Sequence, residues 1–106
     1  MEIKFRYLLD SGWVYYTLEE IESDETIGIE ILDRKYKARN QYTGGKDRNN
    51  KEIYEGDIVE WMADRLIRDE VIFEDGCFMA FGKPISEFIL KIIGNKYENP
   101  KLLEGK

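Results

Sequence analysis

QYTGGKDRNNKEIYEGDIV, residues 41–59, is the stretch of sequence that decides the fold. Its middle is dense in glycine, asparagine and aspartate, which tolerate positive φ angles and form local turns. We therefore expect a tight loop with a short strand on each side. Gly56-Asp57 predicts a second turn, which leads into a strand at 58–61. The Asp57 carboxylate, at the entry of that strand, is expected to accept hydrogen bonds from turn amides.

The rest of the C-terminal half is a series of short apolar stretches separated by turn signals. Asp75-Gly76 is a strong signal, because such a dipeptide suits the positive φ angles of a two-residue hairpin turn. The remaining elements are predicted as strands at 70–74, 77–81 and 91–95, a polar connection at 62–68 and one helical turn at 86–90. Short strands joined by tight turns are typical of a small closed barrel, SH3-like in size.

The N-terminal half is also rich in β patterns. Residues 2–9 alternate with the period of a half-buried strand, and the aromatic stretch 13–17 is predicted to return beside it as a hairpin. A short helix is predicted at 18–25, with Thr17 as its N-cap and Glu20 completing a capping box. Residues 26–32 alternate again and predict a third strand.

These patterns together predict a mainly β fold with a short helix. We expect an N-terminal β-rich portion at 1–40, an SH3-like barrel region at 41–100 and a polar tail at 101–106. A chain of this size buries about two-thirds of its extended surface on folding, which supports a core without disulfides.

Composition narrows the setting in which the protein works. The single cysteine, Cys77, cannot form a disulfide within the chain, and no apolar run approaches the length of a membrane span. We therefore expect a cytoplasmic protein that does not associate with membranes. The net charge of −6 argues against generic nucleic-acid binding, because affinity for nucleic acid comes largely from neutralising phosphates.

The charges are unevenly distributed along the chain. Residues 34–51 are strongly basic, whereas 19–33 and 52–75 are mainly acidic. One interpretation is a mixed, solvated surface; the other is a local basic patch in an acidic protein. Aromatic residues flank the basic loop, and the candidate binding residues are therefore Arg39, Tyr42, Lys46, Arg48, Lys51 and Tyr54. The alternative for the tyrosines is that they fill the core.

No catalytic residue, metal site or cofactor site is predicted. The sequence contains no histidine, which removes the usual neutral-pH base and His-ligated zinc. Cys77 lies in an apolar run and is expected to be a buried structural thiol. Gly44-Gly45-Lys46 lacks the spacing of a phosphate loop, and the loop from Asp47 lacks the ligand pattern of an EF-hand. We expect a protein that is not an enzyme.

Two segments carry a resemblance to a known family. Gln41–Gly44 with Lys46-Asp47, followed by Lys51–Val59, resembles the hallmark stretch of the YopX family of phage and prophage proteins. The opening residues 3–6 and the closing residues 93–100 are similar to the same family. Gly45 and Asn50 depart from it, since the family commonly has a bulky apolar residue and a glycine there; asparagine tolerates the left-handed conformation almost as well as glycine.

The resemblance implies an SH3-like barrel in the C-terminal half and a gene carried by a phage or prophage, and it implies no activity. Our first hypothesis is a phage accessory protein that binds a host or phage protein or assembles with its own copies. Acidic stretches would then face a basic partner surface, in the extreme as a mimic of DNA charge. The alternative is a nucleic-acid-binding module that uses the basic segment 34–51.

Overall fold

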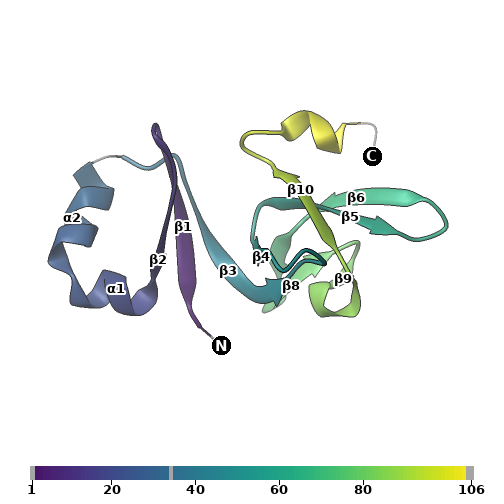
Figure 1. Ribbon diagram of the computed structural model, residues 1–106, viewed down its shortest axis with the longest axis horizontal. Helices are drawn as coiled ribbons and strands as arrows, with labels where there is room; N and C mark the ends of the chain where they lie inside the picture. Colours follow the sequence, from purple (N-terminus) through teal and green to yellow (C-terminus); the bar gives the residue numbers. More distant parts are fainter. Residues whose placement is uncertain (1, 34, 105–106) are drawn as a thin grey trace. The chain divides into compact units, whose positions relative to one another are not determined.

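The computed structural model describes residues 2–33 and 35–104, without the side chains of residues 30, 32 and 33. The chain divides into two compact units, residues 1–44 and 45–106. Figure 1 follows the chain through both. The division falls inside strand β3 (Ala38–Lys46), a few residues beyond the boundary predicted between 40 and 41. The predicted mainly β class is confirmed, and the sheets of the described residues are antiparallel.

The first unit begins with the predicted hairpin. Strand β1 (Lys4–Leu9) pairs with β2 (Gly12–Thr17), with Lys4 opposite Thr17 and Leu9 opposite Gly12. Strand β3 pairs with the other edge of β1, and the sheet has the order β2-β1-β3-β4, where β4 is Glu52–Tyr54. The alternation of residues 2–9 thus predicted the central strand of this sheet.

Helix α1 (Leu18–Ser23) follows β2 directly, as Figure 1 shows. The predicted capping box is confirmed: the Glu20 backbone N–H donates to Oγ1 of Thr17 at 3.1 Å, and the Thr17 N–H donates to Oε1 of Glu20 at 2.8 Å. These bonds lower the pKa of the Glu20 carboxyl below its ordinary value. The helix ends at Asp24, which adopts an extended conformation.

The strand predicted at 26–32 is wrong, because these residues form helix α2 (Glu25–Asp33). Asp24 supplies the reason: its Oδ1 accepts the backbone N–H of Thr26 at 2.9 Å and so caps a second helix. Ile27 and Ile31 are four residues apart, a spacing that places both side chains on one face of a helix and also on one face of a strand. Ile31 is 6% exposed and Ile29 is 59% exposed, as expected of a one-sided helix.

Aromatic residues form much of the core of the first unit. Tyr7 is buried, and its ring lies 5.2 Å from that of Tyr36 and 6.4 Å from that of Tyr16. Leu9, Ile31 and Ala38 complete the buried apolar set among the described residues of this unit outside the tyrosines.

The second unit contains two three-stranded sheets. One has the order β10-β5-β6, from Lys91–Asn95, Asp57–Met62 and Leu66–Glu70. The other has the order β7-β8-β9, from Ile72–Glu74, Cys77–Ala80 and Lys83–Pro84. A bulge between Ile92 and Gly94 interrupts the pairing of β10 with β5. The predicted Asp75-Gly76 hairpin is confirmed, with Glu74 opposite Cys77.

Three predictions for this half change with the structure. The polar connection predicted at 62–68 contains the start of β6, because Leu66 pairs with Met62 to form a hairpin. The strand predicted at 70–74 is divided between β6 and β7 at Val71. The helical turn predicted at 86–90 is a 3-10 turn at Ile85–Glu87. Over residues 35–104, hydrogen bonding gives separate sheets and no closed ring of strands, so the SH3-like barrel remains a prediction.

The core of the second unit is built from residues of β4, β5 and β8 together with Val71 and Leu90. Ile53, Val59, Val71, Ala80 and Leu90 form one buried cluster. Trp61 packs against it, with its ring 4.8 Å from that of Phe88. Trp61 therefore lies at the margin of this core. The tail predicted from residue 101 overlaps a 3-10 helix at Pro100–Leu103, and residues 105–106 lie outside the described part.

No helix in the described part of the chain is both long and apolar enough to cross a membrane.

Candidate functional site

The predicted basic loop is organised by the buried carboxylate of Asp47. Its Oδ1 accepts the backbone N–H groups of Asn49 and Lys51, each at 2.9 Å, and its Oδ2 accepts the N–H of Ile92 at 3.0 Å. Burial opposes ionisation of this carboxyl, but the three backbone hydrogen bonds and the charge of Lys51 lower its pKa below the ordinary value. Asp47 therefore holds the loop together and ties it to β10.

Backbone hydrogen bonds complete the loop. The Asp47 N–H donates to the Lys51 carbonyl at 2.8 Å, and the Arg48 N–H donates to the Leu90 carbonyl at 2.8 Å. Asn50 has a φ of 65°, the left-handed conformation in which the family commonly has glycine. Gly44 and Gly45, which we expected in the loop, belong to β3 instead. The turn is thus a five-residue loop, 47–51, between β3 and β4, and it is closed by its own hydrogen bonds.

The second turn within residues 41–59 is held by Asp57, as predicted. Its Oδ2 accepts the backbone N–H of Tyr54 at 2.8 Å, and its side chain is buried. The Tyr54 hydroxyl donates to the Glu52 carboxylate at 3.2 Å. Both acids of the stretch that are buried, Asp47 and Asp57, are therefore engaged with backbone amides.

The six candidate binding residues are split between the two units. Lys46, Arg48 and Lys51 are exposed around the Asp47 loop of the second unit. Tyr54 belongs to the same unit but is only 2% exposed, so its ring is not available for stacking on a ligand in this conformation. The loop thus presents cations without the aromatic platform that we had placed beside them.

Arg39 and Tyr42 belong to the first unit. Arg39 is exposed, and its guanidinium lies 5.4 Å from the centre of the Phe5 ring. Tyr42 is 7% exposed, and the Lys4 ammonium lies 5.5 Å from its ring centre. The cations of Arg39 and Lys4 therefore each contact an aromatic ring of their own unit. Arg34, at the start of the predicted basic segment, lies outside the described residues.

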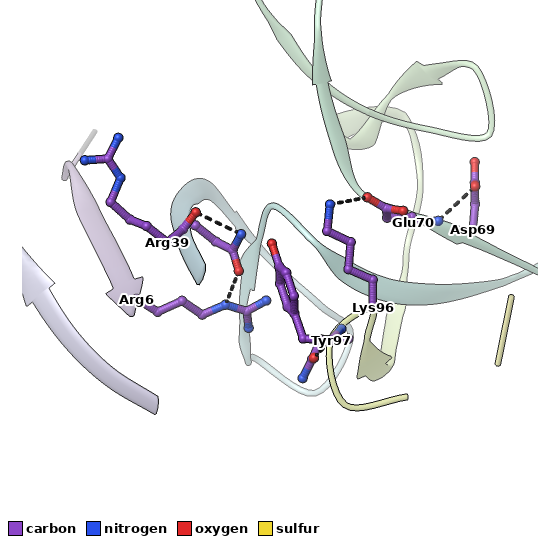
Figure 2. Close-up of polar contacts among 8 residues, drawn as sticks. Arg6, Arg39, Asp69, Glu70, Lys96 and Tyr97 are labelled. Atoms are coloured by element: carbon purple, nitrogen blue, oxygen red, sulfur yellow. Dashed lines mark hydrogen bonds and ion pairs between the residues drawn. The ribbon is translucent and has the colours of Figure 1, made fainter. Parts of the chain in front are cut away.

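Sequence reasoning missed a buried arginine in the first unit. The Nε of Arg6 donates to Oδ1 of Asn40 at 3.0 Å, as Figure 2 shows, and its guanidinium lies 4.2 Å from the centre of the Trp13 ring. Arg6 is 5% exposed. The strand register indicates these contacts of Arg6. Asn40 on β3 lies directly opposite Arg6, and Trp13 on β2 lies diagonally across from it on the same face of the sheet.

An ion pair fixes the end of β10 to β6. Nζ of Lys96 lies 3.2 Å from Oε2 of Glu70, the contact drawn in Figure 2. Partial burial opposes the charge of Lys96, but its hydrogen bond to Glu70 and the nearby carboxyls raise its pKa above the ordinary value. Both side chains remain partly exposed, so this pair contributes little to stability on its own.

The acidic surface of the first unit is carried by its helices. Glu19, Glu20, Glu22, Asp24 and Glu25 are all exposed. An open depression of about 510 Å³ lies against α1, lined by Glu2, Ile3, Thr17, Leu18, Glu19, Glu22 and Ser23. No cluster of three metal-ligating side chains occurs among residues 2–33 and 35–104.

Strand β7 is a further surface feature, because it exposes large apolar side chains. No sequence motif predicted it. Ile72 and Phe73 on β7 are 38% and 53% exposed. The Phe73 ring packs edge-on against Phe78 on β8, with ring centres 4.9 Å apart. Cys77, next to the turn of the same hairpin, is half-buried rather than buried as expected.

A family model described as YopX protein matches residues 5–104, nearly the whole chain. The chain belongs to the YopX family. The solved structures that resemble this YopX chain include that of protein EF1440 from Enterococcus faecalis, which is 31% identical with a TM-score of 0.55. The match covers 86% of this chain and 65% of the EF1440 chain. A comparison with curated proteins finds no match.

The hallmark residues of this YopX chain have structural roles. Asp47 and Asp57 accept backbone hydrogen bonds, and Asn50 supplies a left-handed turn position. Tyr42 and Tyr54 are buried. Residues 41–59 therefore build the loops and core, and the exposed features lie on other segments or on the cations of the loop.

Proposed function

We propose that this YopX protein is a phage- or prophage-encoded accessory protein that acts in the host cytoplasm by binding a protein, without catalysing a reaction. The observation that carries the proposal is the exposed strand β7, where Ile72 and Phe73 present large apolar side chains at the edge of a sheet. Exposed strand edges are sites where proteins add a strand from a partner or from another copy.

The chemistry of the buried acids supports a non-enzymatic function. Among the carboxylates whose side chains are described, Asp47 and Asp57 are the buried ones, and both accept hydrogen bonds from backbone amides. A catalytic carboxyl needs a free oxygen toward a substrate and a raised pKa when it acts as an acid, whereas the pKa of Asp47 is lowered. These side chains are thus committed to holding turns.

The proposal includes an SH3-like frame for residues 41–100. Short antiparallel strands and tight turns support this architecture, and a rigid frame would present the surface hairpin in a fixed geometry. Figure 1 labels strand β8 of this hairpin.

A pull-down from lysate of the natural host tests the proposed function. Tagged protein is incubated with nuclease-treated lysate, bound proteins are identified by mass spectrometry, and the mass of the purified protein is measured by light scattering. We expect either a stoichiometric partner that the tag alone does not retain or a defined oligomer. A monomer that retains no protein from host or phage-infected lysate would refute the proposal.

The second candidate function is nucleic-acid binding, favoured by the three exposed cations of the Asp47 loop. Single-stranded DNA binding measured over a range of salt concentrations tests it. If these cations contact phosphates, reversal of Lys46, Arg48 and Lys51 to glutamate reduces the salt slope by about one per contact. Reversal of Arg65, Lys83 and Lys101, which are also exposed, is the matched control. DNA binding that the first triple variant leaves unchanged would exclude this function.

A further inference from the structure

The β7–β8 hairpin directs the backbone of Phe73 outward. Asp75 and Gly76 have φ angles of 53° and 76°, the two positive values of a type I′ turn. In such a two-residue hairpin the closing pair, Glu74 and Cys77, exchanges hydrogen bonds, and the pairs then alternate. Phe73 and Phe78 form the next, non-hydrogen-bonded pair. The N–H and C=O of Phe73 consequently point away from β8.

Strand β7 is an edge. Its sheet has the order β7-β8-β9, and no other strand pairs with β7 in the described part of the chain. Natural proteins usually protect such an edge with lysine, proline, a bulge or a covering segment. Here the outward backbone groups lie beside two exposed apolar side chains, Ile72 and Phe73. An added strand would pair with the Phe73 backbone and cover its ring.

The charge around this edge indicates the kind of strand that would fit. Residues 69–82 contain four acids and no base. Two of these acids are occupied: Glu70 pairs with Lys96, and Asp69 accepts the N–H groups of Glu70 and Phe81. Glu74 and Asp75 are exposed at the turn, and no described lysine or arginine pairs with them. Their charges favour a basic side chain on the incoming strand.

A second copy of this chain fits the edge less well. In antiparallel pairing of two β7 strands centred on Phe73, Glu74 of each copy would lie opposite Ile72 of the other. Glu74 and Asp75 would then gain no basic partner, and two chains of net charge −6 would be brought together. The charge pattern thus favours a different protein.

We propose that β7 binds an extended, basic and apolar segment of a partner protein as an added strand. Its apolar side chains pack on Phe73, and its lysine or arginine side chains, on the other face of the strand, lie beside Glu74 and near Asp75. This inference rests on the proposed protein-binding function and specifies the partner's chemistry.

A labelled peptide of alternating lysine and valine, KVKVKVK, is the probe. It is titrated with the full-length protein, and binding is followed by fluorescence anisotropy and by shifts of the protein's backbone amide resonances. The control peptides are EVEVEVE, which reverses the charge, and KVKPKVK, whose proline lacks the central N–H. We expect binding of KVKVKVK that is about tenfold tighter than that of either control, with the Phe73 amide among the shifted resonances.

Matched variants locate the binding on β7. Phe73→Thr keeps strand propensity but removes the ring, and its control is Ile89→Thr at another exposed apolar residue. Glu74→Lys reverses a charge at the edge, and its control is Glu87→Lys, which is also exposed. We expect the Phe73 and Glu74 variants to lose about tenfold in affinity and the controls to bind like the parent. Amide spectra show whether each variant remains folded.

The outcomes separate this inference from the proposed function. If the parent retains a stoichiometric partner from lysate, but KVKVKVK does not bind or the Phe73 and Glu74 variants retain the partner unchanged, β7 is not the docking edge and the protein-binding function stands. Equal binding of KVKVKVK to all four variants also overturns the inference. Absence of both a cellular partner and peptide binding overturns both.

Discussion

The Asp47 loop and the β7–β8 hairpin are two tight turns of the same unit that treat their polar groups in opposite ways. In the loop, one buried carboxylate accepts three backbone N–H groups. At the hairpin, the alternation of pairs leaves the N–H and C=O of Phe73 directed outward beside an exposed ring. The comparison teaches that residues 41–59 build the loops and core of the fold, whereas the edge that we propose for partner binding lies in a segment without a motif.

The largest effect is expected from removing the Asp47 carboxylate. Asp47→Ala leaves three backbone donors without their partner, and we expect a loss of about 3 kcal/mol in the free energy of unfolding. Urea denaturation measures it, with Asp64→Ala at an exposed position as the control, where a change within about 0.5 kcal/mol is expected. A small loss for Asp47→Ala would mean that the loop is not organised by this side chain.

Acidic pH should lower the free energy of unfolding by protonating the Asp47 carboxylate. The pKa of Asp47 is lower in the folded than in the unfolded chain, so its contribution is fully present above its unfolded pKa of about 3.9 and is lost as the pH falls through the folded pKa. We expect Asp47→Asn to lose stability mainly at neutral pH and to differ less from the parent at acidic pH. Denaturation from pH 7 to pH 3 measures the difference; a difference that is constant with pH would contradict this assignment.

An intermediate effect is expected at Asn50. Its φ of 65° is unfavourable for alanine, so Asn50→Ala should cost about 1 kcal/mol. Asn50→Gly restores the residue that the family commonly has there and should be neutral to within about 0.5 kcal/mol. Thermal unfolding of the pair measures the contrast. Equal stability of the two variants would show that the loop does not require a left-handed residue.

The smallest effect on stability is expected from Phe73→Thr. The ring is 53% exposed and its loss removes a surface contact with Phe78, so the free energy of unfolding should change by about 0.5 kcal/mol or less. Urea denaturation of this variant beside Ile89→Thr completes the comparison. A loss as large as that of Asp47→Ala would make Phe73 a structural residue and would remove the contrast between the two turns.

The parts of the fold that sequence reasoning predicted are those with local signals. The first hairpin, the Thr17 capping box, the Asp57 turn and the Asp75-Gly76 hairpin each depend on neighbouring residues. Helix α2 was mistaken for a strand because isoleucines at 27, 29 and 31 alternate as in a strand, although 27 and 31 also share a helical face. The Asp24 cap was the signal that could have separated them.

The candidate site was less predictable because it depends on burial, which is set by residues distant in sequence. Tyr42 and Tyr54 flank a basic loop in the sequence, yet both are buried. In the sequence, Arg6 is one charged residue of a predicted strand. Only the folded sheet brings Trp13 of β2 and Asn40 of β3 beside it. The exposure of Phe73 likewise follows from which strand becomes the edge of its sheet, and the sequence does not state that order.

The hydrogen bond between Oδ2 of Asp47 and the N–H of Ile92 joins groups that are 45 residues apart. During synthesis, the loop residues leave the ribosome well before Ile92 does. The Asp47 loop can therefore close locally through Asn49 and Lys51, but its third bond must wait until β10 has been made. Because a bond of this sequence separation forms late, the second unit should reach its final order only after translation of β10, and ribosome-bound chains that stop before Ile92 should hold a locally closed loop that is not yet tied to β10.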